Sequence, residues 1–277
     1  MTPARYTGKK ASLATMHGKL ELISPSMSTL GLDVFPSPID TDVFGTFTGD
    51  VARRASPFET ALAKARDGMR AASTTLGLAS EGSIGVQGFL PIVADVETVI
   101  FVDDDEGFVL AETAVSHHIV THSWTLSQGL PLEADLERAG FPNHGLIVRS
   151  DRKPVDITKG IHDHKELNRV IEHCWEMGAT QVTVESDLRA HHCPSRRPTI
   201  AEAARKLANR LLNSCPSCDC PGWGLVDIVR GRECAQCALP TQAKLADVFG
   251  CSRCSARETG ALNTEPADPS TCERCNP

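Results

Sequence analysis

The sequence lacks long apolar runs. Its longest stretches, such as residues 99–102, are far shorter than the about 20 residues that a membrane-spanning helix needs. The opening residues, MTPARYTGKK, also lack the apolar centre of a secretory signal peptide. We therefore expect a cytoplasmic protein without a membrane partner.

Positive charge is not in excess either. The 28 Lys and Arg residues are outnumbered by 35 Asp and Glu residues, and the formal net charge is −7. Proteins that bind nucleic acid or a membrane surface usually carry a basic face. The balance therefore gives no support for such a partner. The 41% apolar content is ordinary for a globular protein, and 277 residues suffice for one large domain or two smaller ones.

Cysteine, in contrast, is abundant near the C-terminus. Eight of the eleven cysteines form four C-x-x-C pairs, which are Cys215/Cys218, Cys234/Cys237, Cys251/Cys254 and Cys272/Cys275. Each pair can place two thiolates about 2.3 Å from one Zn²⁺, so the pairs predict two closed four-thiolate zinc sites. We expect the first pair to join the second and the third to join the fourth, because the closure is then more local. Interleaved pairing, a cross-brace, is the alternative.

The segment 213–277 is therefore predicted to be a double zinc-ribbon module. It has too few apolar residues to fold alone, so zinc would supply stability and the role is structural. Its six Lys and Arg residues face eight Asp and Glu residues, and four thiolates outweigh the charge of one Zn²⁺. We therefore expect a scaffold, a lid or a contact for a homodimer or protein partner, and not a nucleic-acid surface. Cys220 is left over as a free thiol.

The segment 1–212 is predicted to be an α/β domain with a mixed sheet flanked by helices. Its central stretch runs from Ser56 to residue 85. Ser56 is a good N-cap, Pro57 suits the first helical position, and Glu59 completes a capping box. Apolar residues then recur at helical spacing as far as residue 72. Residues 76–79 predict a buried strand that delivers residues 80–85, with Glu81, into a loop.

Glu59 at a helix start and Glu81 at a strand end are candidates to face one pocket. Ligands of open α/β sheets collect at the carboxyl ends of strands, where glycine lets the backbone approach phosphate. Two carboxylates there would hold a divalent cation. The simpler alternative is that Glu59 only caps its helix and Glu81 only lies in a turn.

Three short motifs resemble one enzyme family. Residues 58–66, FETALAKAR, and 78–83, LASEGS, resemble the F-E-E-N-A-x-x-K-A-R and A-D-D-S-G-L motifs of the inosine/xanthosine triphosphate pyrophosphatases. Residues 13–19, LATMHGK, resemble the A-T-x-N-x-x-K with which that family opens. In the family the first acidic motif binds magnesium and the second supplies the catalytic acid. The resemblance implies an ITPase-like fold, with Glu59 and Glu81 as catalytic residues and magnesium ligands.

The same resemblance implies a set of phosphate-binding residues. Thr15, His17 and Lys19 belong to the motif at residues 13–19, and Lys64 belongs to the motif at residues 58–66. A late basic motif with a histidine recognises the nucleotide in that family, and guanidinium groups bind phosphate by forked hydrogen bonds. The further candidates are Lys159, Arg189, His191, Arg196 and Arg197. Metal binding by residues 191–193 is the weaker alternative, because adjacent residues seldom face one ion.

The sequence thus predicts a Mg²⁺-dependent nucleoside triphosphate pyrophosphatase, acting on a non-standard purine nucleotide, with a structural zinc tail. The alternative is a non-catalytic zinc-ribbon protein that binds a nucleotide, a protein or a nucleic acid. The whole chain also resembles an uncharacterised family of bacterial proteins that pair such an N-terminal domain with a multi-cysteine tail. That second resemblance implies no activity.

Overall fold

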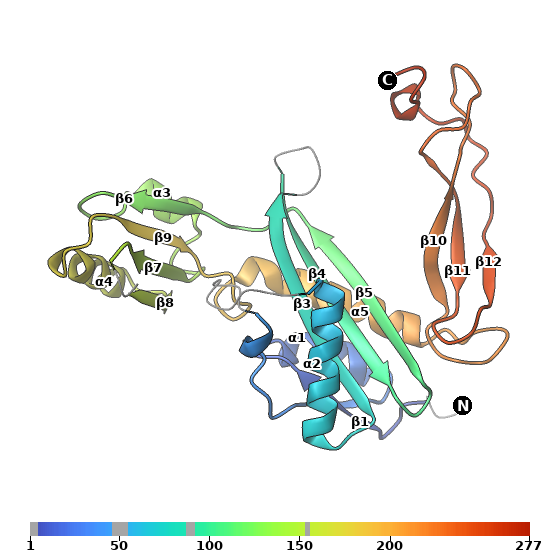
Figure 1. Ribbon diagram of the computed structural model, residues 1–277, viewed down its shortest axis with the longest axis horizontal. Helices are drawn as coiled ribbons and strands as arrows, with labels where there is room; N and C mark the ends of the chain where they lie inside the picture. The colour runs from blue at the N-terminus through green and yellow to red at the C-terminus, as the bar shows by residue number, and fades with distance from the viewer. Residues whose placement is uncertain (1–4, 46–54, 87–91, 153–155) are drawn as a thin grey trace. The chain divides into compact units, whose positions relative to one another are not determined.

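The computed structural model describes residues 5–45, 55–86, 92–152 and 156–277 (Figure 1). The chain divides into two compact units, the first made of residues 1–103 and 111–207 and the second of residues 104–110 and 208–277. The second unit thus contains the acidic turn at residues 104–107 and the three residues that follow it, as well as the cysteine-rich segment. Within the described part of the chain, none of the helices combines the length and the apolar composition that crossing a membrane requires.

The first unit contains a five-stranded mixed sheet. Its strands are β1 (Lys10–Ala14), β2 (Asp33–Pro36), β3 (Leu76–Val86), β4 (Val93–Asp103) and β5 (Phe108–Ser116). They lie in the order β2-β1-β3-β4-β5. β1 runs parallel to both β2 and β3, whereas β3 and β4 are antiparallel. The carboxyl ends of β1 and β2 therefore point to the same edge, and β3 continues beyond the end of β1.

Helices lie on both faces of this sheet. They are α1 (Leu20–Ser28), α2 (Pro57–Ala72) and α5 (Arg197–Leu211), with short 3-10 turns at η1 (Asp42–Phe44) and η2 (Pro194–Arg196). Figure 1 shows α2 in front of the sheet and α5 behind it. The predicted start of α2 is confirmed, because Ser56 is its N-cap and forms a capping box with Glu59. Each side chain of that box bonds a backbone N–H that the helix itself leaves free.

β3 is much longer than predicted. It was expected to end at residue 79, but its eleven residues pair with β4 along their whole length, so Glu81 lies inside a strand and not in a loop. The glycines of this stretch indicate a turn in the sequence, yet Gly82 serves a close approach. A Cβ at Gly82 would lie 2.6 Å from Glu97 Oε1, where the Arg196 guanidinium also lies. The prediction of a loop after residue 79 is therefore wrong.

A second sheet lies between β5 and α5 in the sequence. It is antiparallel, in the order β6-β9-β7-β8, and packs with two helices. The elements are β6 (Ser123–Leu126), α3 (Glu133–Arg138), β7 (Leu146–Ser150), β8 (Ile157–Ile161), α4 (His164–Glu176) and β9 (Val182–Ser186). The apolar face of α4 buries Leu167, Ile171 and Cys174 against Val182 and Val184. Cys174 is thus a core residue, as its place on the apolar stripe of α4 indicates.

The second unit contains a three-stranded antiparallel sheet. Its strands are β10 (Gly224–Arg230), β11 (Lys244–Gly250) and β12 (Arg257–Thr259), in that order, and the 3-10 turn η3 (Pro269–Thr271) follows. Each C-x-x-C pair lies outside a strand. The strands therefore carry the chain from one pair to the next.

Candidate functional site

The first unit has a small pocket, with a volume of about 40 Å³, beyond the carboxyl end of β1. It lies between the turn that follows β1, the helix α2, the middle of β3 and the segment that leads into η2. The charged and titratable residues that line it are His17, Lys19, Asp42, Lys64, Glu81 and Arg196. Thr15 and Ser80 add hydroxyl groups.

Lys19 comes into the pocket from the turn between β1 and α1. His17 and Gly18 both have positive φ, and this backbone conformation turns the chain within a few residues. The Lys19 Nζ donates to Ser80 Oγ at 3.1 Å and lies 3.6 Å from Glu97 Oε2. Burial lowers the pKa of Lys19, and the Glu97 carboxylate opposes that effect. The ammonium group is therefore held at one point by two partners.

Lys64 and Glu81 form a buried ion pair on the face of the sheet that α2 covers. Lys64 lies on the side of α2 that contacts β3, and Glu81 lies on the face of β3 that points towards α2. Their side chains are only 9% and 6% exposed. Removing one partner would leave the other charge buried and unpaired, which is strongly unfavourable. The pair therefore fixes a carboxylate and an ammonium group side by side in the pocket.

Arg196 forms the floor of the pocket and is completely buried. Its Nε donates to Glu97 Oε1 at 2.8 Å, its Nη2 also donates to Glu97, and its Nη1 donates to the Leu188 carbonyl. The guanidinium is thus fully engaged by the protein. This side chain ties β4 to the segment that leads into α5, and substrate binding by Arg196 stays a prediction.

Glu59 lies apart from this arrangement. It is not among the residues that line the pocket, it is exposed, and its Oε2 accepts from the Ser56 N–H at 3.0 Å and from the Ser56 hydroxyl at 2.7 Å. These hydrogen bonds also lower the pKa of Glu59. The simpler alternative, a helix cap, therefore describes Glu59. The magnesium pair of Glu59 with Glu81 is not assembled by the described contacts.

The remaining predicted residues also lie outside the pocket lining. Arg189 pairs with Asp187, with its Nε 2.9 Å from Asp187 Oδ1, and Arg197 pairs with Glu21 at 2.7 Å. Lys159 lies in β8 of the second sheet. Thr15, His17, Lys19, Lys64, Glu81 and Arg196 are thus brought together, whereas Glu59, Lys159, Arg189, His191 and Arg197 are not part of the lining.

A row of imidazole rings begins at the pocket. His17 stacks on His191 with ring centroids 5.0 Å apart, and His191 lies 3.9 Å from His192. His162 Nε2 lies 2.8 Å from His192 Nδ1, and His162 Nδ1 lies 2.7 Å from the Pro142 carbonyl. A carbonyl only accepts, so His162 Nδ1 donates, and in a neutral pair His192 Nδ1 donates to His162 Nε2. Sequence reasoning considered His192 only as an alternative metal ligand and did not consider His162.

Two acids under the pocket were also missed. Asp95 and Glu97 are fully buried on β4, at positions i and i+2 of a strand whose other residues are mostly apolar. Residues two apart in a strand share a face of the sheet. Two acids on one face of a buried strand are a signal that the sequence carries, but their cationic partners, Lys19 and Arg196, are remote in the chain.

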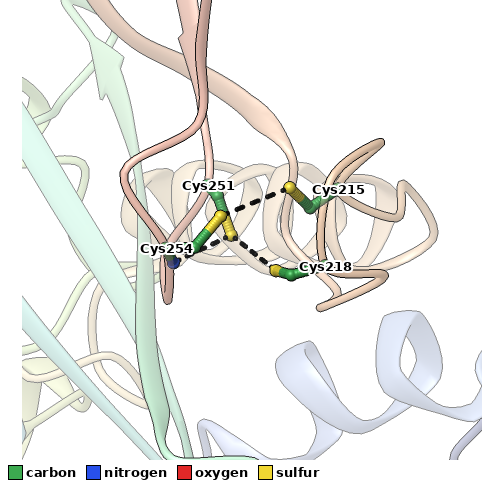
Figure 2. A group of neighbouring side chains, drawn as sticks. All are labelled: Cys215, Cys218, Cys251 and Cys254. Carbon is green, nitrogen blue, oxygen red and sulfur yellow. Dashed lines mark hydrogen bonds between the residues drawn. The ribbon is translucent and has the colours of Figure 1, made fainter.

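The second unit contains two clusters of four cysteines. One consists of Cys215, Cys218, Cys251 and Cys254, shown in Figure 2, and the other of Cys234, Cys237, Cys272 and Cys275. Within each cluster the sulfurs lie within 4.8 Å of one another, and the closest cross-pair distances are 3.6–3.9 Å. A tetrahedron with bonds of about 2.3 Å to zinc has edges of about 3.8 Å. Each cluster can therefore hold one tetrahedral metal ion.

The pairing of the clusters is interleaved. The first C-x-x-C pair joins the third and the second joins the fourth, so the predicted sequential pairing is wrong. Local loop closure does not decide the pairing, because the segments between the pairs are not flexible loops. β10 and β11 each extend over seven residues, and at about 3.3 Å per residue each strand carries the chain roughly 20 Å away from the pair that precedes it.

The first two C-x-x-C turns repeat one local structure. Asp219 and Ala238, which follow the second cysteines, both have positive φ, and their N–H groups donate to the carbonyls of Cys215 and Cys234 at 2.9 Å. The sequences CPSCDCP and CAQCALP align so that Cys220 takes the place of Leu239. The corresponding backbone bonds, to the Cys220 and Leu239 carbonyls, are both 2.9 Å long. Cys220 is thus a buried apolar position outside the four-sulfur cluster.

Comparison with known proteins places the chain in a family. Residues 64–277 match the family described as a domain of unknown function, DUF6671. No curated protein and no solved structure matches the chain. The matched range begins at Lys64 within α2 and includes both cysteine clusters. Since it covers more than half of the sequence, the chain belongs to the DUF6671 family.

Proposed function

We propose that the first unit hydrolyses a nucleoside triphosphate, with preference for a non-standard purine, to the monophosphate and pyrophosphate. The observation that carries the proposal is the convergence of Lys19, Lys64 and Glu81 on one pocket beyond the carboxyl end of β1. Two ammonium groups can neutralise phosphate oxygens, and a carboxylate between them can accept a proton.

The reaction has a simple balance. A water oxygen attacks the α-phosphorus, the bond between that phosphorus and the oxygen that bridges to the β-phosphate breaks, and pyrophosphate leaves. The Glu81 carboxylate accepts the proton of the attacking water. Lys19 and Lys64 offset the negative charge that gathers on the departing pyrophosphate. Ser80 positions the Lys19 ammonium group through their 3.1 Å hydrogen bond.

Magnesium fits this donor set. Mg²⁺ is usually held by one or two carboxylates together with substrate phosphates and water, and Glu81 supplies a carboxylate at the pocket wall. Of the two glutamates, only Glu81 would hold the ion, because the Glu59 carboxylate accepts hydrogen bonds from Ser56. A bound Mg²⁺ lowers the pKa of an attacking water and neutralises phosphate charge.

Pyrophosphate release from a panel of nucleoside triphosphates with Mg²⁺ tests the activity. We expect turnover by the parent protein and a loss of at least about 100-fold in kcat for Glu81→Gln, which removes the proton acceptor. Glu59→Gln is the matched control, since it changes the exposed acid of the helix cap, and it retains parent activity. The proposal fails if no triphosphate is turned over, or if Glu81→Gln is as active as the parent.

We further propose that both cysteine clusters bind structural Zn²⁺. Four thiolates with no open position are the donor set of a structural zinc site. Metal analysis of the purified protein is expected to give about two zinc ions per chain, falling to about one in Cys234→Ser. Cys220→Ser is the control, because this thiol lies outside both clusters, and it keeps both ions. A folded second unit without metal would contradict the assignment.

A second candidate is a non-catalytic protein that binds a nucleotide or a protein partner, with the zinc module as a scaffold. It is favoured by the fact that both lysines of the pocket already pair with acids, Lys19 with Glu97 and Lys64 with Glu81. Calorimetry with the same triphosphates separates the two functions. Binding without pyrophosphate release supports this candidate.

A further inference from the structure

The two buried acids of β4, Asp95 and Glu97, differ in their hydrogen-bond and ion-pair partners. Glu97 accepts from Arg196 Nε at 2.8 Å and lies 3.6 Å from Lys19 Nζ. Asp95 lies two residues earlier on the same face of β4 and is also 0% exposed. Arg196 Nε lies 3.9 Å from Asp95 Oδ1, but that group already donates to Glu97.

The Thr199 hydroxyl lies near the Asp95 carboxylate and lowers its pKa, but burial raises that pKa by more. Among the described residues, neither of its carboxylate oxygens has a hydrogen-bond partner. The polar groups that face it are Glu97 from β4, Arg196 from η2, the Thr199 hydroxyl from α5 and the Cys193 thiol. A buried carboxylate beside a second carboxylate and without a hydrogen bond of normal geometry is unfavourable, and this favours the protonated form of Asp95.

This proton decides the charge beneath the pocket. At the pocket the buried cations are Lys19, Lys64 and Arg196, and the buried acids that lie beside them are Glu81, Glu97 and Asp95. If every group is charged, three positive charges meet three negative ones. If Asp95 is protonated, one positive charge is left to attract an anion. Asp42 at the rim has a side chain that is 43% exposed, so water screens its charge.

We propose that the pocket binds a phosphate-like oxyanion together with a proton on Asp95, so that anion affinity and the protonation of Asp95 are coupled. The proposal rests on the same pocket as the proposed function. Asp95 does not touch the ligand. It acts through Arg196 and Lys19 and is therefore a positioning residue. By linkage, a bound anion also makes Asp95 harder to deprotonate.

The pH range of the coupling is set by the surroundings of Asp95. Burial and the neighbouring Glu97 raise the pKa of Asp95 to about 7. Below this value the proton is in place and the pocket favours an anion. When the pH rises above this value, Asp95 loses its proton in the protein without a bound anion. Anion binding must then return a proton to Asp95.

Sulfate is the probe, because it stays doubly charged from pH 6 to pH 8 whereas phosphate itself titrates there. We expect the affinity of the full-length parent for sulfate, measured by calorimetry, to fall about tenfold between pH 6 and pH 8. Calorimetry in buffers of different ionisation enthalpy is expected to show uptake of one proton on binding at pH 8. Asp95→Asn, which mimics the protonated acid, keeps the affinity that the parent has at pH 6 at both values. Glu59→Gln, the exposed acid, behaves like the parent.

The same tenfold fall in Asp95→Asn, or no fall in the parent, would overturn the coupling while leaving triphosphate hydrolysis intact. If the parent does not bind sulfate at any pH, the pocket is not an anion site, and the proposed function fails with the coupling. A measurement on the unaltered protein covers the case in which Asp95→Asn does not fold. Infrared difference spectra at pH 8 are expected to gain the carbonyl band of a protonated carboxyl group when sulfate binds, and the absence of that band contradicts the proposal.

Discussion

At the scale of single residues, the surroundings of His17, His191 and His192 disfavour the charged form of these imidazoles. Burial lowers the pKa of His17, His191 and His192, and the positive charge of Arg189 acts in the same direction. For His192 the value falls to about 4, although Asp187 opposes the shift. A second charge in this row would face its neighbours at ring distances of 3.9–5.0 Å. The row is therefore a part of the fold that acid should weaken.

We predict that His192→Gln changes the pH dependence of stability. The pKa of His192 is depressed from 6.5 to about 4, so its contribution to stability is present above pH 6.5 and is lost as the pH falls towards 4. Such a shift corresponds to about 3 kcal/mol at most, and partial exposure of the ring reduces it to about 1–2 kcal/mol. We expect urea unfolding to show that, between pH 7.5 and pH 4.5, the parent loses about 1–2 kcal/mol more of its free energy of unfolding than the variant does. An equal difference at both pH values would refute this. His173→Gln, in an exposed part of α4, is the control.

At the scale of elements, β3 needs a glycine at position 82, because the Arg196 side chain lies where a Cβ would stand. Gly82 lies opposite Glu97 in the β3–β4 register, and the Arg196 guanidinium packs over it. The strand therefore continues past its glycine because β4 and η2 supply partners. Both lie far from Gly82 in the sequence, and a local pattern cannot reveal them.

We predict that Gly82→Ala destabilises the first unit by about 2–4 kcal/mol, because the new Cβ overpacks the site and displaces a buried ion pair. Gly85→Ala is a close control in the same strand. A Cβ at Gly85 has no heavy atom within 4 Å, so this variant should be neutral or gain about 0.5 kcal/mol. Denaturant unfolding measures both. Equal effects of the two substitutions would show that the contact with Arg196 and Glu97 is unimportant.

The elements that could be predicted from the sequence are those with local signals. The start of α2 follows from Ser56, Pro57 and Glu59, which lie within four residues of one another. The cysteine spacing gave the eight ligand candidates in the same way. Their pairing was not predictable from loop closure, because it depends on β10 and β11 forming strands between the pairs. The acids on β4 were visible, but the cations that pair with them come from the turn before α1 and from η2.

At the scale of the whole molecule, interleaved pairing links the two metal sites through one strand. The chain between Cys218 and Cys251 and the chain between Cys237 and Cys272 both contain β11. Each bound ion therefore restrains the same strand. With sequential pairing the two loops would share no residues, and each site would form independently.

This shared strand predicts cooperative metal binding. Loss of one cluster in Cys254→Ser frees one end of β11, so the ion in the cluster of Cys234 and Cys272 should bind about tenfold more weakly, within the usual range of coupling between sites. Competition with a chromophoric chelator measures the affinity of the remaining ion, with Cys220→Ser as the control that keeps parent affinity at both sites. Parent affinity of the remaining ion in Cys254→Ser would mean that the clusters fold separately. Because unfolded chains lack preformed sites, the coupling should also appear as a single transition when the parent is stripped of zinc, in which β10, β11 and both clusters lose structure together.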